Sequence, residues 1–318
     1  MELDICSLGN AIVDIQFSIT NEYEEELNNL QITKGSMMLV EQDQQEEMIK
    51  KLNSIYGIPL MACGGSAINS IVAASCFGSH CHVSGKVSND EHGNYFLEDL
   101  GNNNIQHSIT PSQSEVTTAR CLVMVSPDAE RTMVTFLGIA GKISEKDIDE
   151  NAIKESEMIF LEGYLWDDGE PKSAFNKAML LSNKTAMTLS DQFCVERHKD
   201  SFLDLVKNKL DIIFANEQEI KSLIDSTNFD DVVTFGKQLE KSLIITRGEN
   251  GSIAIIKDEV VECDSKKNLT ICDLTGAGDL FAAGFLHGQI NSFSTRESLE
   301  KGTEMSSQII QKIGARLN

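Results

Sequence analysis

The residues with the clearest chemical potential lie at positions 273–279, which read Asp-Leu-Thr-Gly-Ala-Gly-Asp. An apolar helical pattern starts at Leu280, and we expect a strand over 269–272, so the motif falls in a strand-to-helix turn. The first amides of a helix have no partner within the helix and carry the positive end of its dipole. Small residues let an anion approach the backbone. The turn therefore predicts a phosphoryl site formed by Gly276, Ala277 and Gly278.

The motif ends in Asp279, whose charge does not suit simple phosphate binding. A carboxylate beside a phosphate weakens binding by like-charge repulsion. The same carboxylate is well suited to take the proton from a hydroxyl that attacks phosphorus. The alternative is that Asp279 only caps the helix and the glycines only form the turn. The motif alone leaves both interpretations open.

Two further segments could hold a nucleotide and its metal ion. Asn216 and Glu219 follow a buried strand and share one helix face, so they could hold hydrated Mg²⁺ through its waters; the alternative is a capping box. The segment 246–251 joins two apolar strands, and its amides could contact phosphates or ribose; the alternative is a plain hairpin turn.

Polar residues near the N-terminus could bind the hydroxyls of a small substrate. Asn10 and Asp14 follow the first buried strand. The pair Gly64 and Gly65 precedes a small-residue helix that carries Asn69, and Ser66 is expected to cap this helix. Carboxylate and amide groups at such positions can hydrogen-bond a vicinal diol. Each residue alone is more typical of a cap or a turn.

Arg120 interrupts an otherwise apolar strand over 117–123. A half-exposed surface arginine is the simpler interpretation. If this strand belongs to a lid over the site, the guanidinium could reach the transferring phosphate.

The composition, the net charge and the absence of certain motifs argue against several classes of function. The net charge of −22 disfavours binding to nucleic acid, whose phosphates it would repel. No apolar run approaches the length that spans a bilayer and no signal peptide is recognisable, so we expect a cytoplasmic protein without a membrane partner. The eight cysteines are scattered, as is typical of reduced, packed thiols. A P-loop and a GxGxxG after the first strand are both absent.

The elements that must position these residues alternate between strand and helix, which predicts a mostly parallel sheet covered on both faces. Ligands bind beyond the carboxyl ends of such strands. Two half-polar regions do not fit this layer and predict a small β lid. We expect the α/β domain to comprise 1–10, 41–104 and 141–318, and the lid 11–40 and 105–140.

Taken together, the motifs resemble the ribokinase family, also called the PfkB carbohydrate kinases. The resemblance rests on Asp-x-x-Gly-Ala-Gly-Asp at 273–279, the pair at 64–65, Asn216-x-x-Glu219 and Gly248-x-x-Gly251. It implies a ribokinase-like three-layer α/β/α fold with a β-sheet lid, and it implies ATP and Mg²⁺. By position, Asp279 would be the base, Asn216 and Glu219 would organise Mg²⁺, and Asn10, Asp14, Gly64, Gly65 and Asn69 would bind the substrate. The ATP site would be lined by Thr246, Gly248, Gly251 and Thr275.

Within the family, the segments 9–14, 64–70 and 189–193 are similar to the adenosine kinase branch. This similarity implies phosphorylation of a primary hydroxyl on a ribose-containing molecule, adenosine first. Two alternatives remain: a sugar kinase acting on ribose, fructose or a keto-deoxy sugar acid, and an inactive nucleotide-binding sensor. The sequence allows a monomer or a homodimer.

Overall fold

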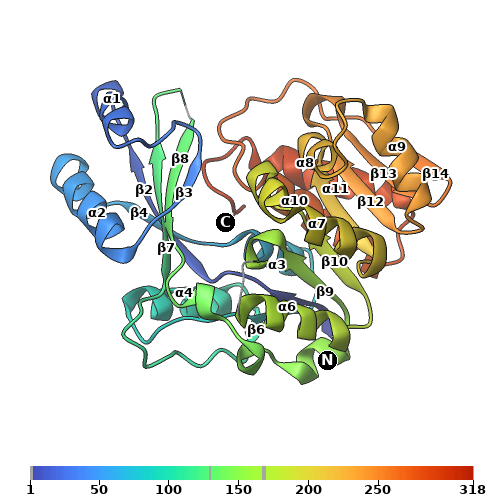
Figure 1. The fold of residues 1–318 in the computed structure, drawn as a ribbon, viewed down its shortest axis with the longest axis horizontal. Coiled ribbons are helices and arrows are strands. Elements are labelled where there is room, and N and C mark those ends of the chain that lie inside the picture. The colour runs from blue at the N-terminus through green and yellow to red at the C-terminus, as the bar shows by residue number, and fades with distance from the viewer. Residues whose placement is uncertain (1–2, 129, 167–169, 318) are drawn as a thin grey trace.

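The computed structural model describes residues 3–128, 130–166 and 170–317. Its larger sheet has nine strands in the described residues (Figure 1). Neighbouring strands are parallel except in the pairs β12–β13 and β13–β14, which are antiparallel. In sheet order these strands are β14 (Glu259–Cys263), β13 (Ser252–Ile256), β12 (Ser242–Thr246), β11 (Ile212–Asn216), β10 (Thr185–Thr188), β9 (Ser156–Glu162), β1 (Leu3–Leu8), β5 (Cys81–Ser84) and β6 (Gln106–His107).

Helices cover both faces of this sheet because its buried strands are apolar on both sides. In β9, Phe160 faces one core and its neighbours Ile159 and Leu161 face the other, as alternation requires. The first core is closed by α3 (Ser66–Cys76), α4 (Glu91–Asn102), α10 (Ala277–Ile290) and α11 (Thr295–Ile309). The second is closed by α5 (Glu150–Glu155), α6 (Glu170–Leu181), α7 (Gln192–Asn208), α8 (Glu217–Leu223) and α9 (Phe229–Gln238).

A second, five-stranded sheet stands beside the first and has its own apolar core (Figure 1). Two helices, α1 (Asn21–Asn29) and α2 (Gln42–Tyr56), pack on one of its faces. The other face looks toward the larger sheet and bears both polar residues, such as Asp14 and Thr135, and apolar residues, such as Ile12 and Met133. In sheet order the strands are β3 (Met37–Leu39), β8 (Arg131–Phe136), β7 (Ala119–Val125), β2 (Ile12–Ser18) and β4 (Leu60–Gly64).

The structure differs from the predicted boundaries in three places. Residues 41–64 were assigned to the larger domain, but α2 packs on the smaller sheet and β4 pairs with β2 within it. Strand β6 was assigned to the lid but extends the larger sheet beside β5. Residues 269–272 do not form a strand; the amide of Cys272 instead bonds the carbonyl of Ile310. Positions 1 and 318, which bound the predicted division, lie outside the described residues.

Among the described residues, no helix combines the length and the apolar character needed to cross a bilayer.

Gly251, in the turn between β12 and β13, lies where the fold leaves no room for a side chain. Gly251 has φ 83° and ψ −140°, and a Cβ there would lie 2.1 Å from the Cys263 carbonyl oxygen. Gly57 has nearly the same backbone, φ 80° and ψ −151°, with open space around it. Both glycine-to-alanine changes incur the strain of this backbone region, about 1–3 kcal/mol.

We predict that Gly251→Ala lowers the free energy of unfolding by about 1–3 kcal/mol more than Gly57→Ala does, because only Gly251→Ala adds crowding. Denaturant unfolding of both variants measures the difference. Equal losses would mean that the turn relaxes freely and that packing does not demand a glycine at 251.

Candidate active site

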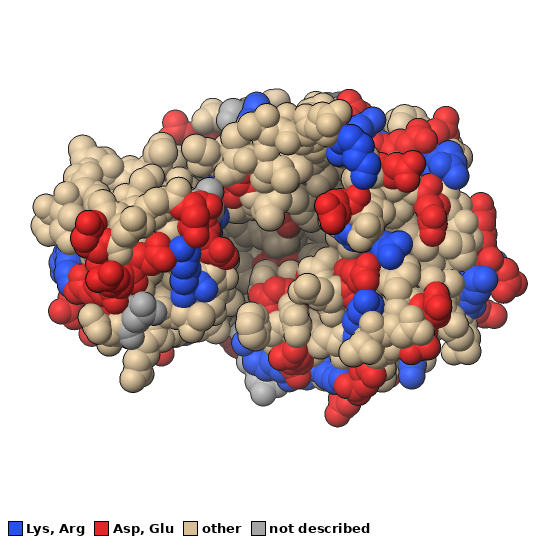
Figure 2. All heavy atoms as spheres, turned by 90° about the horizontal axis from the view of Figure 1, so that it is seen from above, with Lys and Arg blue, Asp and Glu red and all other residues tan. Residues whose placement is uncertain are grey.

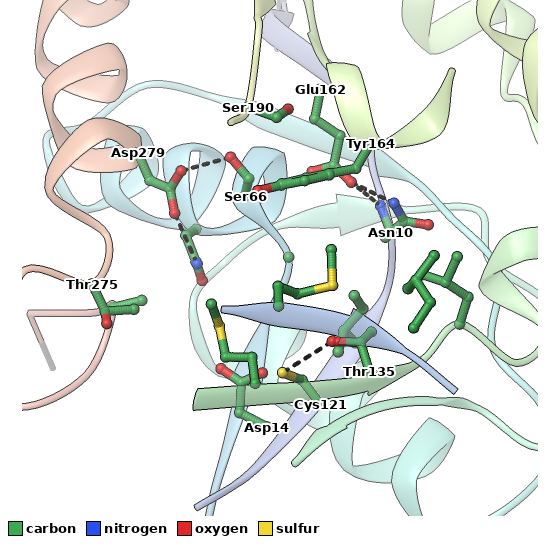
Figure 3. A pocket seen from close by; sticks show the side chains of 18 of the residues that line it. Asn10, Asp14, Ser66, Cys121, Thr135, Glu162, Tyr164, Ser190, Thr275 and Asp279 are labelled. Atoms are coloured by element: carbon green, nitrogen blue, oxygen red, sulfur yellow. Dashed lines mark hydrogen bonds between the residues drawn. The ribbon is translucent and has the colours of Figure 1, made fainter. Parts of the chain in front are cut away.

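Asp279 lies in the first turn of α10, and its carboxylate is held by helix α3. Ser66 Oγ donates to Asp279 Oδ1 at 2.6 Å, and Asn69 Nδ2 donates to Oδ2 at 3.1 Å. Figure 3 shows Asp279 and Ser66 pointing toward one another. The N-cap of α10 is Gly276, with φ 75°, and the N-cap of α3 is Gly65. Neither Asp279 nor Ser66 is the N-cap of its helix, so the capping roles considered for them are not observed.

The surroundings of Asp279 set its protonation. Burial raises the pKa of its carboxyl to about 6, while the bonds from Ser66 and Asn69 and the nearby charge of Arg316 act in the opposite direction. Asp279 is consequently ionised at neutral pH but close enough to its pKa to accept and release a proton. The positions of both oxygens are fixed before a substrate arrives.

Two cavities meet at this carboxylate. The smaller, about 250 Å³, lies between the two sheets, and the larger, about 840 Å³, lies over the N-terminus of α10. Three residues line both: Ser66, Ser190 and Asp279. Figure 2 shows the molecule hollowed between its two parts, with acidic side chains spread over the surrounding surface. A group in one cavity can thus meet a group in the other at Asp279.

The smaller cavity has a polar end and an apolar wall. Four predicted substrate residues line it: Asn10, Asp14, Gly65 and Asn69. Its apolar wall consists mainly of Ile12, Met37, Leu39, Met133 and Leu137. Gly65 has φ 100°, and a Cβ there would lie 2.1 Å from the Asn10 carbonyl oxygen. Gly64 does not line the cavity; a Cβ at Gly64 would lie 2.9 Å from Asp14 Oδ2, so this glycine leaves room for the carboxylate.

Glu162 joins three parts of this site and was not anticipated from the sequence. It ends β9, is fully buried, and accepts bonds from Asn10 N (2.9 Å), Asn10 Nδ2 (2.7 Å) and Ala67 N (2.7 Å). Burial raises its pKa to about 7, and the bonds from Ala67 and Asn10 oppose that rise. The one available signal was an acidic residue at the carboxyl end of an apolar strand. Glu162 fixes the start of α3 and the root of β2 relative to each other.

The larger cavity receives the N-terminus of α10, and Gly276, Ala277 and Gly278 line it. Asn216, Glu219, Thr246 and Gly248 also line it, whereas Gly251 does not. Thr275 lines the smaller cavity instead of the larger one. The positive end of a 14-residue helix thus points into a cavity large enough for a nucleotide, although the Ala277 amide already donates to the Leu274 carbonyl at 3.2 Å.

Asn216 and Glu219 form a capping box at the start of α8. Asn216 Oδ1 accepts from Glu219 N at 2.8 Å, and the Glu219 oxygens accept from Asn216 N (2.9 Å) and Nδ2 (2.6 Å). Glu219 is buried, which raises its pKa to about 7. Both carboxylate oxygens of Glu219 are engaged in these hydrogen bonds. The pair therefore fits a cation held through water rather than one ligated directly. Within the described ranges, no cluster of three or more His, Cys, Asp or Glu side chains could ligate a metal directly.

The predicted catalytic role of Arg120 does not fit the structure. Its neighbour Cys121 lines the smaller cavity, so strand alternation turns Arg120 to the opposite face of the lid. There it pairs with Glu46 of α2 at 3.2 Å and lies over the ring of Phe136. Arg120 therefore belongs to the packing of α2 on the sheet.

Arg131 is the lid arginine that faces the site. It lies on the same face of β8 as Met133 and Thr135, which line the smaller cavity, and it forms an ion pair with Asp273. Asp273 also accepts from the amides of Thr275 (2.9 Å) and Gly314 (2.6 Å). The available signal was that residues 131, 133 and 135 alternate onto one face of a strand. Which face that is could be decided only from the register of β8. Arg131 links the lid to the glycine-rich loop.

Three comparisons with known proteins bear on this geometry. The model of the pfkB family carbohydrate kinases matches residues 59–318. The crystal structure of adenosine kinase from Sinorhizobium meliloti is similar with a TM-score of 0.92 and 33% identity, covering 99% of this chain and 96% of that one. Adenosine kinase from Saccharomyces cerevisiae is 25% identical over 99% of this chain and 96% of its own length. A 5-dehydro-2-deoxygluconokinase from Geobacillus kaustophilus is 25% identical over 78% of each chain.

These matches confirm the ribokinase-like α/β/α fold with its small β sheet. They also confirm an enzyme that transfers a phosphoryl group to an alcohol, with ATP as the donor that the family implies. The match to the family model covers well over half of the chain. The chain therefore belongs to the pfkB family of carbohydrate kinases.

Proposed function

We propose that this kinase transfers the γ-phosphoryl group of ATP to a primary hydroxyl of a ribose-containing substrate, with adenosine as the first candidate. The observation that supports this most is the meeting of two cavities at Asp279. The larger cavity would hold ATP with its phosphates toward the α10 amides. The smaller cavity would hold the acceptor, so that its hydroxyl and the phosphoryl group meet beside one carboxylate.

The smaller cavity favours a substrate with a polar and an apolar end. Asp14 and Asn69 offer hydrogen bonds to ribose hydroxyls, and the wall formed by Met37, Met133 and Leu137 suits a flat heterocycle. A free sugar would leave that wall exposed to water. The likeness to an adenosine kinase of known structure agrees with this assignment. The similarity to a 5-dehydro-2-deoxygluconokinase keeps a sugar acid as the alternative acceptor.

Each group of residues has a defined task in the proposed reaction. Asp279 takes the proton of the attacking hydroxyl, and Ser66 and Asn69 hold the carboxylate in place. The amides of residues 276–278 stabilise the charge that spreads over the transferring phosphoryl group. Asn216 and Glu219 would hold Mg²⁺ through water; when bound, the ion neutralises charge on the phosphates. The surrounding lid residues exclude water from the acceptor.

The first prediction concerns the base. Asp279→Asn should lower kcat by about 10²–10⁴-fold, because the amide cannot accept the proton. The variant should keep its fold, since an amide can still bond Ser66 and Asn69. Asp258→Asn, in the exposed turn between β13 and β14, is the matched control and should retain full activity. Steady-state kinetics decide the matter, and near-normal turnover by Asp279→Asn would refute the assignment.

The second prediction concerns pH. A base with a pKa raised to about 6 is active when deprotonated, so kcat should be sustained above about pH 6 and fall as pH drops through that value. The pKa of Asp14 is also raised to about 6 by burial, so the two must be separated. Asp14→Asn should raise the acceptor KM but keep the acid limb of the kcat profile. If Asp14→Asn loses the acid limb, the limb reports the protonation of Asp14 and not of Asp279, which contradicts the prediction.

The third prediction concerns the acceptor. In a panel of adenosine, ribose, fructose and a keto-deoxy sugar acid with ATP, adenosine should give the highest kcat/KM, because only the nucleoside covers the apolar wall. Formation of ADP that depends on the acceptor is the measurement. Turnover of ribose without turnover of adenosine would favour the sugar-kinase alternative. Absence of ADP with every acceptor would favour the sensor.

A further inference from the structure

The segment 314–317 runs along the active site after α11, and Figure 1 places the C-terminal end between the two sheets. The Gly314 amide donates to Asp273 Oδ2 at 2.6 Å. Ala315 lines the smaller cavity, and its Cα would lie 2.8 Å from a Cβ added to Gly276. Lys312 Nζ holds the Leu317 carbonyl oxygen at 2.7 Å. The segment is therefore fixed on the glycine-rich loop.

Its most informative side chain is Arg316, which bridges two groups beneath the site. Arg316 Nε donates to Asn69 Oδ1 at 3.2 Å, and Nη1 forms an ion pair with Asp99 of α4. The side chain is only 12% exposed. Its remaining nitrogen, Nη2, is buried with no hydrogen-bond partner in the described part of the chain. Burying this guanidinium costs desolvation free energy, which an ion pair at the surface would not incur.

The contact with Asn69 determines which way that amide faces. An asparagine side chain has one accepting end and one donating end. Because Oδ1 accepts from Arg316, Nδ2 is turned toward Asp279 and donates to it at 3.1 Å. The reverse orientation would put two oxygens, Asn69 Oδ1 and Asp279 Oδ2, against each other. It would also leave the Arg316 donor facing an NH₂ group.

We infer that Arg316 is a positioning residue for phosphoryl transfer: it fixes the Asn69 amide, which in turn orients the Asp279 carboxylate toward the acceptor. This inference rests on the proposed function, since it takes Asp279 as the base. Arg316 does not touch the reacting atoms; its effect passes through Asn69. Asp99 supplies the opposite end of the bridge and anchors the guanidinium to α4.

The charge of Arg316 adds an independent, measurable effect. Its positive charge lowers the pKa of both Asp279 and Asp14, against the larger effect of burial. Removing that charge should therefore raise the pKa of Asp279 further. The acid limb of the kcat profile should move to higher pH.

Three variants test the inference. Arg316→Met keeps most of the apolar stem but loses charge and donors; kcat should fall by about 10–100-fold, since small misplacements near the reacting groups have effects of this size. Its acid limb should move to higher pH. Arg316→Lys keeps the charge but cannot reproduce the guanidinium fork, so the limb should stay near the wild-type position while kcat recovers only in part. Arg296→Met, on α11 and bonded to the Glu262 carbonyl, is the control and should match wild type.

The outcomes separate this inference from the proposed function. Wild-type turnover together with the loss in Asp279→Asn establishes the base independently. With that in hand, an unchanged kcat and acid limb in folded Arg316→Met would overturn the role of Arg316. Equal losses in the methionine and lysine variants with an unmoved limb would also overturn it, because they would indicate packing alone. If Arg316→Met does not fold, an acid limb that moves to higher pH in Arg316→Lys would contradict the charge effect.

Discussion

The active site depends on one constraint: a carboxylate must be held at the meeting point of two cavities, beside a site that attracts anions. Asp279 meets it through donors from another helix, Ser66 and Asn69 of α3. This arrangement requires α3 and α10 to pack closely with their N-termini at the same end of the sheet. Gly65 and Gly276 make this possible, because each adopts a positive φ where a side chain would collide with backbone. The N-terminus of α10 stays open toward the larger cavity.

The site gathers carboxyl groups whose protonation is poised near neutrality. Burial raises the pKa of Asp14 and Asp279 to about 6, and of Glu162 and Glu219 to about 7. Such clusters of perturbed groups are typical of functional sites. Two arginines, Arg131 and Arg316, provide local positive charge in a chain whose net charge is −22. Together with the α10 dipole, they make an anionic substrate compatible with an acidic protein.

Much of this site could be predicted from the sequence because its signals are local. The motif at 273–279 and the polar residues Asn10, Asp14 and Asn69 each lie next to a recognisable element. Residues 274–279 and these three polar residues line the two cavities. The arginine was misassigned because a strand pattern gives alternation but not which face is inward. Arg120 and Arg131 could be told apart only from the register of β7 and β8. The lid boundary failed at β4 for a similar reason, since its pairing with β2 joins segments far apart in sequence.

The account makes its most direct claim about where an acceptor hydroxyl meets a phosphoryl group. A crystal structure with adenosine and a non-hydrolysable ATP analogue bound together would measure this. We expect the primary hydroxyl within about 2.6–3.2 Å of an Asp279 oxygen, with the terminal phosphoryl group against the amides of residues 276–278. An acceptor hydroxyl directed to another side chain, with Asp279 still bonded only to Ser66 and Asn69, would contradict the account.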